Sequence, residues 1–492
     1  MDLILAIDMG TTGVRAIVYD TSGTALASAY AKLGMQVSED GWISQDPEEM
    51  FNTSLAVANE VCEKFSGSIA AMGITAQRGT AIAWDRESGK ALHSAISWQD
   101  QRTLARVQEL IAMGIPVNTL AGCTKFEWLI QNVPEVAEAA SVNRLAFGTP
   151  DAWLTACFSQ QQVLVTDCTN AGATGLYDAA QMQWFDMAME LFHQKPEWHM
   201  KIVGTDAHVG VTDLLKCGKG VALTARVGDQ QAACFAHTLK PGESKLTLGT
   251  SGMLDVHCGE TTPEEAPGTH ALPLWHLADQ TQKYCLEGSV LTAGASIEWA
   301  QRVGLMQDIN ELAELKWDPQ PEVLFVPALA GLGTPYLVRE ARAQFTGLSL
   351  SSTRTDLLQG IIAGIAHRCA DLVDTLGSAC GQKSSVRESS GQKSSVRESS
   401  GQDQQGIATV FVDGGLSQSD SLMQGIADFG NVTVKRSAVP EMTALGGAML
   451  ASRQTSVPIE SENNYSEFTP AISADAREQQ RNIWKVQIET LR

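Results

Sequence analysis

Two stretches of nearly the same design occur in the chain, at residues 3–20 and at residues 244–257. Each consists of an apolar run, a turn rich in Gly and Thr, and a second apolar run. Apolar runs bounded in this way by glycine indicate strand–turn–strand hairpins. The chain has 492 residues, which is too long for a single core. A hairpin repeated in both halves therefore predicts a duplicated domain.

The first hairpin carries a turn whose chemistry suits a phosphate group. Glycines flank Thr11 and Thr12, so the backbone there can come close to a ligand, and the two hydroxyls offer hydrogen bonds. Arg15 adds a fixed positive charge. Asp8, at the end of the first strand, is placed to give an oxygen ligand to a metal carried by the phosphate. An ordinary hairpin with a glycine turn is the alternative for this stretch alone.

Composition describes an acidic globular protein and excludes several partners. Apolar residues make up 44% of the chain, charged residues 18%, and the formal net charge is −21. Such a surface repels nucleic acids and anionic membranes. No apolar window approaches the roughly 18 residues of a membrane span, and the chain enters a strand at once, which leaves no room for a signal peptide. We therefore predict a cytoplasmic protein, and its ten cysteines, without a Cys-x-x-Cys pair, are expected to be reduced thiols.

A third glycine element, residues 413–415, also follows an apolar strand. Three such elements in this order, two of them near-copies, indicate two phosphate-facing hairpins and a further glycine loop. This arrangement predicts an α/β protein with two ribonuclease-H-like domains of the actin, hexokinase and Hsp70 type around a central cleft. The predicted domains are residues 1–242 and 243–453, followed by a C-terminal tail at 454–492.

One segment departs from this pattern. Residues 381–390 are repeated letter for letter at 391–400, and residues 401–402 begin a third copy. The repeat is polar and rich in Ser and Gly, so it cannot contribute to a core. We predict that 381–402 is a flexible surface loop, since lengthening a loop adds little closure entropy. Its Ser and Arg content also leaves a regulatory role open.

With these elements in place, the chain resembles the FGGY carbohydrate kinases. It is most similar to glycerol kinase, in the divergent glycerol-kinase-5-like branch. The matching motifs run nearly from end to end: residues 73–78, 84–85, 96–102, 147–154, 166–171, 228–231, 248–250, 294–297, 335–336, 341–342, 413–415 and 443–448. The resemblance implies an ATP-dependent kinase that uses Mg²⁺ and phosphorylates a primary hydroxyl.

The resemblance also implies roles for individual residues. The nucleotide is expected to contact seven positions: Thr11, Thr12, Arg15, Thr250, Gly294, Gly415 and Ser419. The acceptor is expected to contact Arg78, Trp98, Asp229 and Gln230. Asp8 matches the carboxylate near the metal, and Asp229 matches the catalytic base.

Each of these polar residues also has a structural alternative. Asp229 could only cap a helix, Asp8 could only close a turn, Arg78 could form a surface ion pair, and Trp98 could belong to the core. Asp229 nevertheless meets the requirement of phosphoryl transfer for one carboxylate near the attacking hydroxyl, because it follows a strand and precedes a helix.

The acceptor site departs from the glycerol kinase pattern at two positions. Gly79 stands where glycerol kinases carry an acid, and Leu120 stands where they carry a Tyr. Losing a carboxylate and a phenol removes two partners for hydroxyl groups. Gly13 and Ser419 also replace a usual Ser and Asn near the nucleotide.

We therefore predict a kinase that converts glycerol to glycerol 3-phosphate or acts on a close polyol, with a pentulose or another sugar as the alternative acceptor. A nucleotide-binding protein without an acceptor and a catalytically silent relative are further alternatives. The sequence leaves open whether the chain forms a homo-oligomer.

Overall fold

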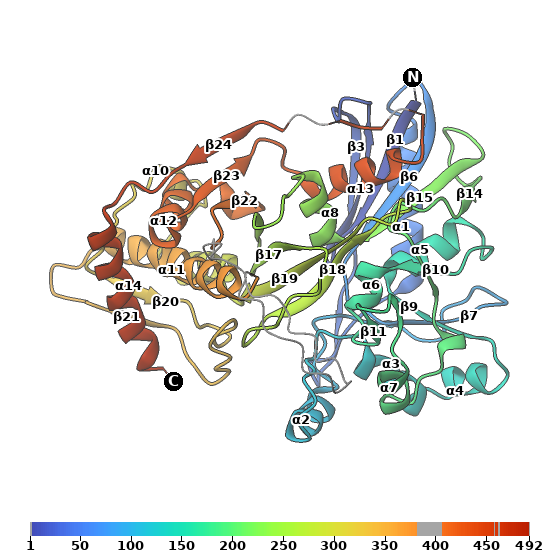
Figure 1. Cartoon of the computed structure of the whole chain (residues 1–492), viewed down its shortest axis with the longest axis horizontal. Helices are drawn as coiled ribbons and strands as arrows, with labels where there is room; N and C mark the ends of the chain where they lie inside the picture. The colour runs from blue at the N-terminus through green and yellow to red at the C-terminus, as the bar shows by residue number, and fades with distance from the viewer. Residues whose placement is uncertain (1, 381–405, 457, 461–462, 492) are drawn as a thin grey trace, which may run out of the picture. The chain divides into compact units, whose positions relative to one another are not determined.

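The computed structural model describes residues 2–380, 406–456, 458–460 and 463–491 and divides into two compact units (Figure 1). Unit 1 comprises Met1–Thr238, Leu272–Gln282 and Glu441–Glu462. Unit 2 comprises Leu239–Ala271, Lys283–Pro440 and Asn463–Arg492. The two-domain α/β prediction is confirmed, although two segments from the second half of the chain belong to unit 1. The predicted loop at 381–402 lies outside the described residues.

Unit 1 is built on a six-stranded sheet with the order β14-β15-β6-β1-β2-β3. Its three central strands, β15 (Val221–Gly228), β6 (Ser68–Ala76) and β1 (Asp2–Met9), run parallel. Met9 and Gly228 both pair with Ala76, so these three strands end level at one edge of the sheet. Loops at the carboxyl ends of parallel strands are where an open α/β sheet places its ligands.

The hairpin predicted at the N-terminus is present. β1 pairs antiparallel with β2 (Gly13–Tyr19), which pairs with β3 (Ala25–Lys32). A helix, α1 (Pro47–Cys62), follows the third strand of this hairpin and two short strands. The Asp46 carboxylate accepts a hydrogen bond from the Glu48 amide and caps this helix, and Pro47 fills its first position.

Helices cover both faces of the unit 1 sheet. Side chains of α1 and of α5 (Pro150–Phe158) share a core with Met72 and Ile74 of β6. The neighbouring positions in β6, Gly73 and Thr75, contact α13 (Met442–Ser452) on the other face. Helix α13 also packs against α8 (Asp229–Ala236), which begins directly after β15.

The remaining elements of unit 1 are short. They are β4 (Gln36–Val37), β5 (Ile43–Gln45), β7 (Ile82–Asp85), β8 (Ala95–Ile96), α2 (Leu104–Ala112), α3 (Cys123–Asn132), α4 (Pro134–Ser141), β9 (Leu145–Gly148), β10 (Val165–Asp167), α6 (Cys168–Gly172), β11 (Tyr177–Asp178), β12 (Gln183–Trp184), α7 (Asp186–Leu191), η1 (Pro196–Trp198), β13 (Lys201–Val203) and β14 (Gly210–Thr212). Strand β18 (His270–His276) spans the sequence boundary between the units.

Unit 2 repeats the strand pairing of unit 1. β16 (Ser244–Leu248) pairs antiparallel with β17 (Gly252–Gly259) and parallel with β22 (Thr409–Asp413), as β1 pairs with β2 and β6. The sheet continues with β19 (Gln282–Val290) next to β17 and β23 (Thr433–Ser437) next to β22. This shared pattern is the duplication expected from the two hairpins.

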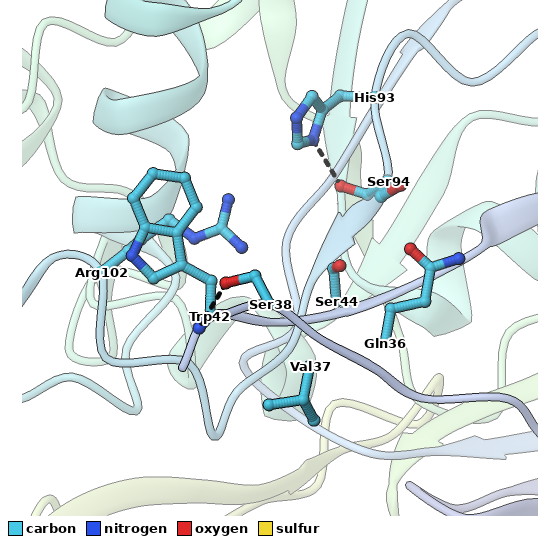
Figure 2. Close-up of a pocket in the computed structure, with 8 residues that line it drawn as sticks. All are labelled: Gln36, Val37, Ser38, Trp42, Ser44, His93, Ser94 and Arg102. Carbon is cyan, nitrogen blue, oxygen red and sulfur yellow. Dashed lines mark hydrogen bonds between the residues drawn. The ribbon is translucent and has the colours of Figure 1, made fainter. Parts of the chain in front are cut away.

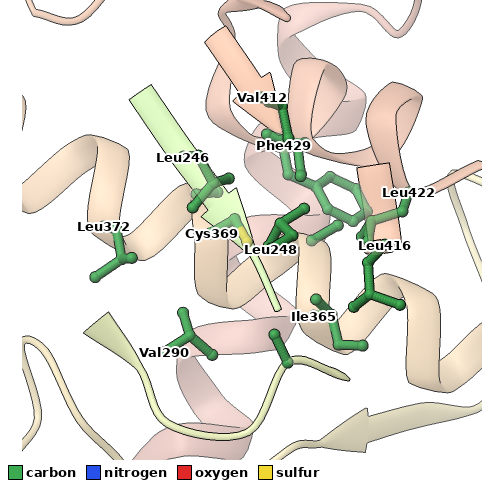
Figure 3. Close-up of a cluster of buried hydrophobic side chains, with 14 of the residues drawn as sticks. Leu246, Leu248, Val290, Ile365, Cys369, Leu372, Val412, Leu416, Leu422 and Phe429 are labelled. Atoms are coloured by element: carbon green, nitrogen blue, oxygen red, sulfur yellow. The ribbon is translucent and has the colours of Figure 1, made fainter. Parts of the chain in front are cut away.

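Two helices, α11 (Arg354–Cys380) and α12 (Asp420–Gly430), supply much of the unit 2 core. Figure 3 shows Ile365, Cys369 and Leu372 of α11 gathered with Leu246 of β16 and Phe429 of α12. The other elements of unit 2 are α9 (Gly294–Arg302), α10 (Glu311–Glu314), β20 (Leu324–Val326), β21 (Gln344–Thr346), η2 (Gly415–Gln418), β24 (Tyr465–Phe468) and α14 (Ala474–Glu489).

The C-terminal segment expected as a tail contains regular structure. β24 pairs antiparallel with β23, and α14 places Trp484 in a buried stack against His367 of α11. Arg481 of α14 forms an ion pair with Asp371 of α11, with a distance of 2.6 Å between nitrogen and oxygen. The last helix is therefore packed into unit 2.

The prediction that all ten cysteines are reduced thiols is wrong for four of them. Cys62 is joined to Cys217, and Cys258 is joined to Cys380. The six other cysteines are free thiols. Partners separated by 155 and 122 residues give no short spacing motif, which is why sequence inspection does not find them.

Within the described ranges, no helix combines the length and the apolar character that crossing a membrane requires.

Candidate active site

Three predicted site residues meet at the edge of the unit 1 sheet where β1, β6 and β15 end. Asp8 is the penultimate residue of β1, Arg78 follows β6, and Asp229 follows β15. The Nε atom of Arg78 lies 3.5 Å from Oδ1 of Asp229, and both side chains keep some exposure to solvent. The register of the three strands therefore brings together residues that lie far apart in sequence.

Asp8 accepts a hydrogen bond from a neighbouring residue and interacts electrostatically with a second carboxylate. Its Oδ1 accepts a hydrogen bond from the Thr75 hydroxyl at 2.8 Å. Burial raises the pKa of Asp8 to about 6, and the negative charge of Asp229 acts in the same direction against the hydrogen bond from Thr75. A buried carboxylate beside a second negative charge forms a place where a cation is favourable.

A buried hydrogen-bond network holds the backbone before Asp229. The Gly228 amide donates to Oγ1 of Thr169 at 2.7 Å, and the Thr169 hydroxyl donates to the Asp167 carboxylate. Thr205 donates to the same carboxylate at 3.0 Å. A β-carbon at Gly228 would lie 2.6 Å from Cδ of Arg78, so only glycine lets Arg78 lie across this position.

The first glycine turn is tied to Trp98 through Thr11. The indole Nε1 of Trp98 donates to Oγ1 of Thr11 at 2.9 Å, and the Trp98 amide donates to Oγ1 of Thr80. Trp98 is only partly buried, so it lies at the border of the site and not in the core. Thr12 is exposed at the tip of the same turn.

Two glutamines complete this side of the site. The Gln45 amide nitrogen donates to the Thr11 carbonyl at 2.8 Å, and the Gln77 amide donates to Oε1 of Gln45 at 2.8 Å. Both glutamines are almost fully buried. Neither glutamine is among the site residues predicted from the sequence. The sequence offers one signal for Gln45, which directly precedes the helix cap Asp46. Because side chains alternate along a strand, Gln45 points away from the side on which Asp46 lies.

Arg15 is engaged in an ion pair. Its Nη1 contacts Oε1 of Glu441, and its guanidinium carbon lies 5.3 Å from the centre of the Tyr30 ring. About a third of each charged side chain of the pair is exposed. Gln230 is the last residue predicted to contact the acceptor. Its backbone N–H donates to Oδ1 of Asp229 at 2.8 Å and so helps to orient that carboxylate.

Unit 2 contains the second glycine turn, at residues 249–252, next to the start of α9. The Gly294 and Ala295 amides at the start of α9 donate to the carbonyls of Gly249 and Thr250, each at 3.0 Å. A β-carbon at Gly294 would lie 2.4 Å from the Gly249 carbonyl oxygen, so this close approach requires glycine. Thr250 itself is exposed.

The third glycine loop adjoins this hairpin. Gly414 has φ +88°, and a β-carbon there would lie 2.5 Å from the Leu248 carbonyl oxygen. A β-carbon added at Gly415 would meet no atom within 4 Å. The Ser419 hydroxyl is buried and caps α12 by accepting a hydrogen bond from the Leu422 amide. Four of the predicted nucleotide positions thus belong to unit 2. One of them, Ser419, also serves as a helix cap.

A separate open cavity of about 420 Å³ lies beside the small sheet of β4, β5 and β8 (Figure 2). Ser44 faces this cavity, whereas the next residue, Gln45, faces Thr11. Arg102 lines it, held in a bidentate contact with Asp100 and lying 4.6 Å from the Trp42 ring centre. The predicted nucleotide and acceptor residues are not among those that line it.

The residues at the sheet edge fit a magnesium ion carried by phosphate. Among the described residues, no group of three or more His, Cys, Asp or Glu side chains could hold a metal alone. Mg²⁺ bound with a nucleotide needs only one or two carboxylates, because phosphate and water supply the other ligands. Asp8, with its raised proton affinity beside Asp229, meets that requirement.

Comparison with known proteins identifies relatives along the whole chain. Residues 3–236 match the family model for the N-terminal domain of the FGGY family of carbohydrate kinases, and residues 245–455 match the model for the C-terminal domain. A glycerol kinase from Janthinobacterium sp. (strain Marseille) is 34% identical, with 99% of this chain and 98% of that protein covered. A glycerol kinase from Roseobacter denitrificans is 31% identical over the full length of both chains.

Solved structures agree with these relatives. The crystal structure of Plasmodium falciparum glycerol kinase with ADP superposes with a TM-score of 0.88 at 26% identity, covering 100% of this chain and 98% of that one. Ligand-bound xylulose kinase from Lactobacillus acidophilus gives a TM-score of 0.82 at 20% identity, covering 100% and 98%. The second similarity shows a shared fold alone.

Proposed function

The chain belongs to the FGGY family of carbohydrate kinases, and we propose that the alcohol it phosphorylates is glycerol or a close polyol. It is an ATP-dependent phosphotransferase that acts on an alcohol group. Relatives named glycerol kinase that match nearly its full length support the choice of acceptor. We also propose that it acts in the cytoplasm, where ATP is available.

The observation that carries the catalytic proposal is the pairing of Arg78 with Asp229 at the level edge of the sheet. In the proposed reaction, the acceptor oxygen attacks the γ-phosphorus as the bond from phosphorus to the ADP oxygen breaks. Asp229 takes the proton of the attacking hydroxyl. Arg78 and the Gln230 amide keep the Asp229 carboxylate oriented toward the acceptor.

The nucleotide is proposed to be held by residues of both units. In unit 1 these are Thr11, Thr12 and Arg15 on the first hairpin turn. In unit 2 they are Thr250, Gly294, Gly415 and Ser419. Asp8 would hold Mg²⁺, which when bound neutralises charge on the phosphate oxygens. Backbone amides and hydroxyls of glycine turns are suited to phosphate.

A pentulose or another sugar is the second candidate acceptor. Gly79 has φ +73° and no side chain, and Leu120 offers an apolar side chain that is 42% exposed. The site therefore lacks two hydrogen-bonding groups that a small polyol would use, which leaves room for a larger acceptor.

The experiment that decides between them is ADP release, measured by a coupled assay, over a panel of polyols and ketoses. We expect glycerol or a close polyol to give the highest kcat/KM. A ketose that exceeds glycerol tenfold would replace the proposed acceptor, and turnover independent of any acceptor would contradict the proposed function.

A further inference from the structure

Lys125, near the start of α3, is a fully buried lysine whose partners are backbone carbonyls. Its Nζ lies within hydrogen-bonding distance of four carbonyl oxygens, those of Thr119 at 2.8 Å, Leu120 at 3.0 Å, and Gly79 and Ala121 at 3.2 Å. Burying an ammonium group is unfavourable unless such bonds replace its hydration. The catalytic proposal gives this buried charge no part.

The four carbonyls come from two separate loops. Gly79 belongs to the loop after β6, and residues 119–121 belong to the loop before α3. The loops touch, since a β-carbon at Gly79 would lie 2.3 Å from the Leu120 carbonyl oxygen. The carbonyl oxygens of Gly79 and Leu120 both lie within 3.2 Å of the Lys125 Nζ. Carbonyl oxygens that converge on one point repel each other, and the N–H donors of a shared amino group offset that repulsion. Lys125 is therefore the group that keeps the two loops together.

This contact lies beside the proposed acceptor residues. Gly79 directly follows Arg78, and the position of its missing β-carbon is 3.5 Å from the β-carbon of Trp98. The Trp98 amide is bonded to Thr80, the residue after Gly79. Any shift of the Gly79 loop would therefore move Arg78 and Trp98 together.

We propose that Lys125 is a positioning residue for acceptor selectivity, which clamps the loop of Gly79 to the loop of Leu120 and so sets the width of the acceptor site beside Trp98. The proposal rests on the proposed kinase function. Lys125 has no contact with the acceptor and acts only through the two loops. Its loss should raise the KM of small acceptors more than that of larger ones, because a looser wall holds a small molecule less well.

The test compares the variant Lys125→Met with the wild-type chain on the acceptor panel, with the KM of ATP measured in parallel. We expect the KM of the best small acceptor to rise tenfold or more, the KM of ATP to stay within twofold, and the preference for small over large acceptors to fall. Gly79→Ala perturbs the same contact from the other side and should shift selectivity in the same direction. Lys125→Arg retains the charge and should recover part of the selectivity.

Matched controls separate this role from a general loss of packing. Lys245 is another fully buried lysine, paired with Asp255 at 2.9 Å in unit 2, so Lys245→Met removes a buried ammonium elsewhere. Gly114 has φ +81°, and a β-carbon added there would meet no atom within 4 Å, so Gly114→Ala adds backbone strain without a clash. Neither control should change acceptor selectivity.

An unchanged selectivity in Lys125→Met, or in Lys125→Gln if the Met variant does not fold, would overturn the inference. A change of the same size in Lys245→Met would also overturn it. Wild-type protein without acceptor-dependent turnover would contradict the proposed function instead, so the two failures are distinguishable.

Discussion

Asp229 is the residue on which the proposed chemistry depends most directly. Replacing it with Asn keeps the shape and the contact with Arg78 but removes the group that takes the proton. We expect Asp229→Asn to lower kcat about 10²–10⁴-fold, which is the usual contribution of a general base. The dissociation constant of ATP, measured by calorimetry, should stay within twofold. A kcat within threefold of the wild-type value would remove Asp229 from this role.

Asp151 offers a test of buried charge by its pH dependence. Its carboxylate is fully buried and accepts hydrogen bonds from Thr149 and Thr166, yet burial and the nearby Asp167 raise its pKa to about 6. Between its unfolded pKa near 3.9 and its folded pKa, unfolding releases the proton, so this group lowers stability as pH rises and the loss is complete above pH 6.

The variant Asp151→Asn does not titrate and avoids that loss. Its free energy of unfolding relative to the wild-type chain should therefore rise by about 1 kcal/mol between pH 5 and pH 7.5. Urea denaturation at both pH values measures this difference. The control is Asp356→Asn, because hydrogen bonds from Thr353 lower the pKa of the Asp356 carboxyl. That carboxyl is ionised in the folded and unfolded chain at both pH values, so the difference in free energy of unfolding between this variant and the wild-type chain should not change with pH. An equal difference at both pH values for Asp151→Asn would contradict the prediction.

At the scale of elements, the glycines of α13 allow this helix to pack closely against α8 within unit 1. A β-carbon at Gly446 would lie 1.8 Å from the carbonyl oxygen of Ala232 in α8. We expect Gly446→Ala to lower the free energy of unfolding by about 1–3 kcal/mol, the usual cost of overpacking. Because α8 begins at Asp229, kcat should fall as well.

Urea denaturation of Gly446→Ala measures the first effect and the coupled assay the second. Gly430→Ala is the matched control, since Gly430 is also helical and an added β-carbon there meets only ordinary contacts of 3.4 Å or more. Equal stability of the two variants would show that α13 and α8 can separate at little cost.

Elements with local signals could be predicted from the sequence. The two hairpins each carry apolar runs and a glycine turn of their own, and the structure has both. The catalytic candidates at strand ends followed from the resemblance, and strand register then accounts for their meeting.

Features set by contacts distant in sequence could not be predicted in this way. Nothing local to Gly446 and Gly447 indicates that their helix belongs to unit 1. The glycines are needed because the helix lies close to the backbone of Ala232 and the side chain of Thr75, which are distant in sequence. The role of Lys125 likewise depends on carbonyl groups, which every residue carries. The two disulfides and the regular structure after residue 463 escaped prediction for the same reason.

At the scale of the whole molecule, the same strand pattern occurs in two units, each with a glycine turn suited to phosphate. The net charge of −21 works against any anionic ligand at long range, so we infer that local groups such as these turns bind the nucleotide. If turns of both units bind ATP, then a change in either unit should weaken the stabilisation that ATP gives to the folded chain.

The variants Thr11→Ala and Thr250→Ala test this, one in each unit. A ligand at 100 times its dissociation constant raises the free energy of unfolding by about 2.7 kcal/mol, and tenfold weaker binding removes about 1.4 kcal/mol of that gain. We expect each variant to lose at least this much when wild-type-saturating ATP and Mg²⁺ are added, as measured by urea denaturation with and without ligand. Thr261→Ala, an exposed threonine elsewhere in unit 2, should keep the full gain. If Thr250→Ala keeps the full stabilisation by ATP, the second glycine turn does not contact phosphate, although its strands pair as those of the first turn do.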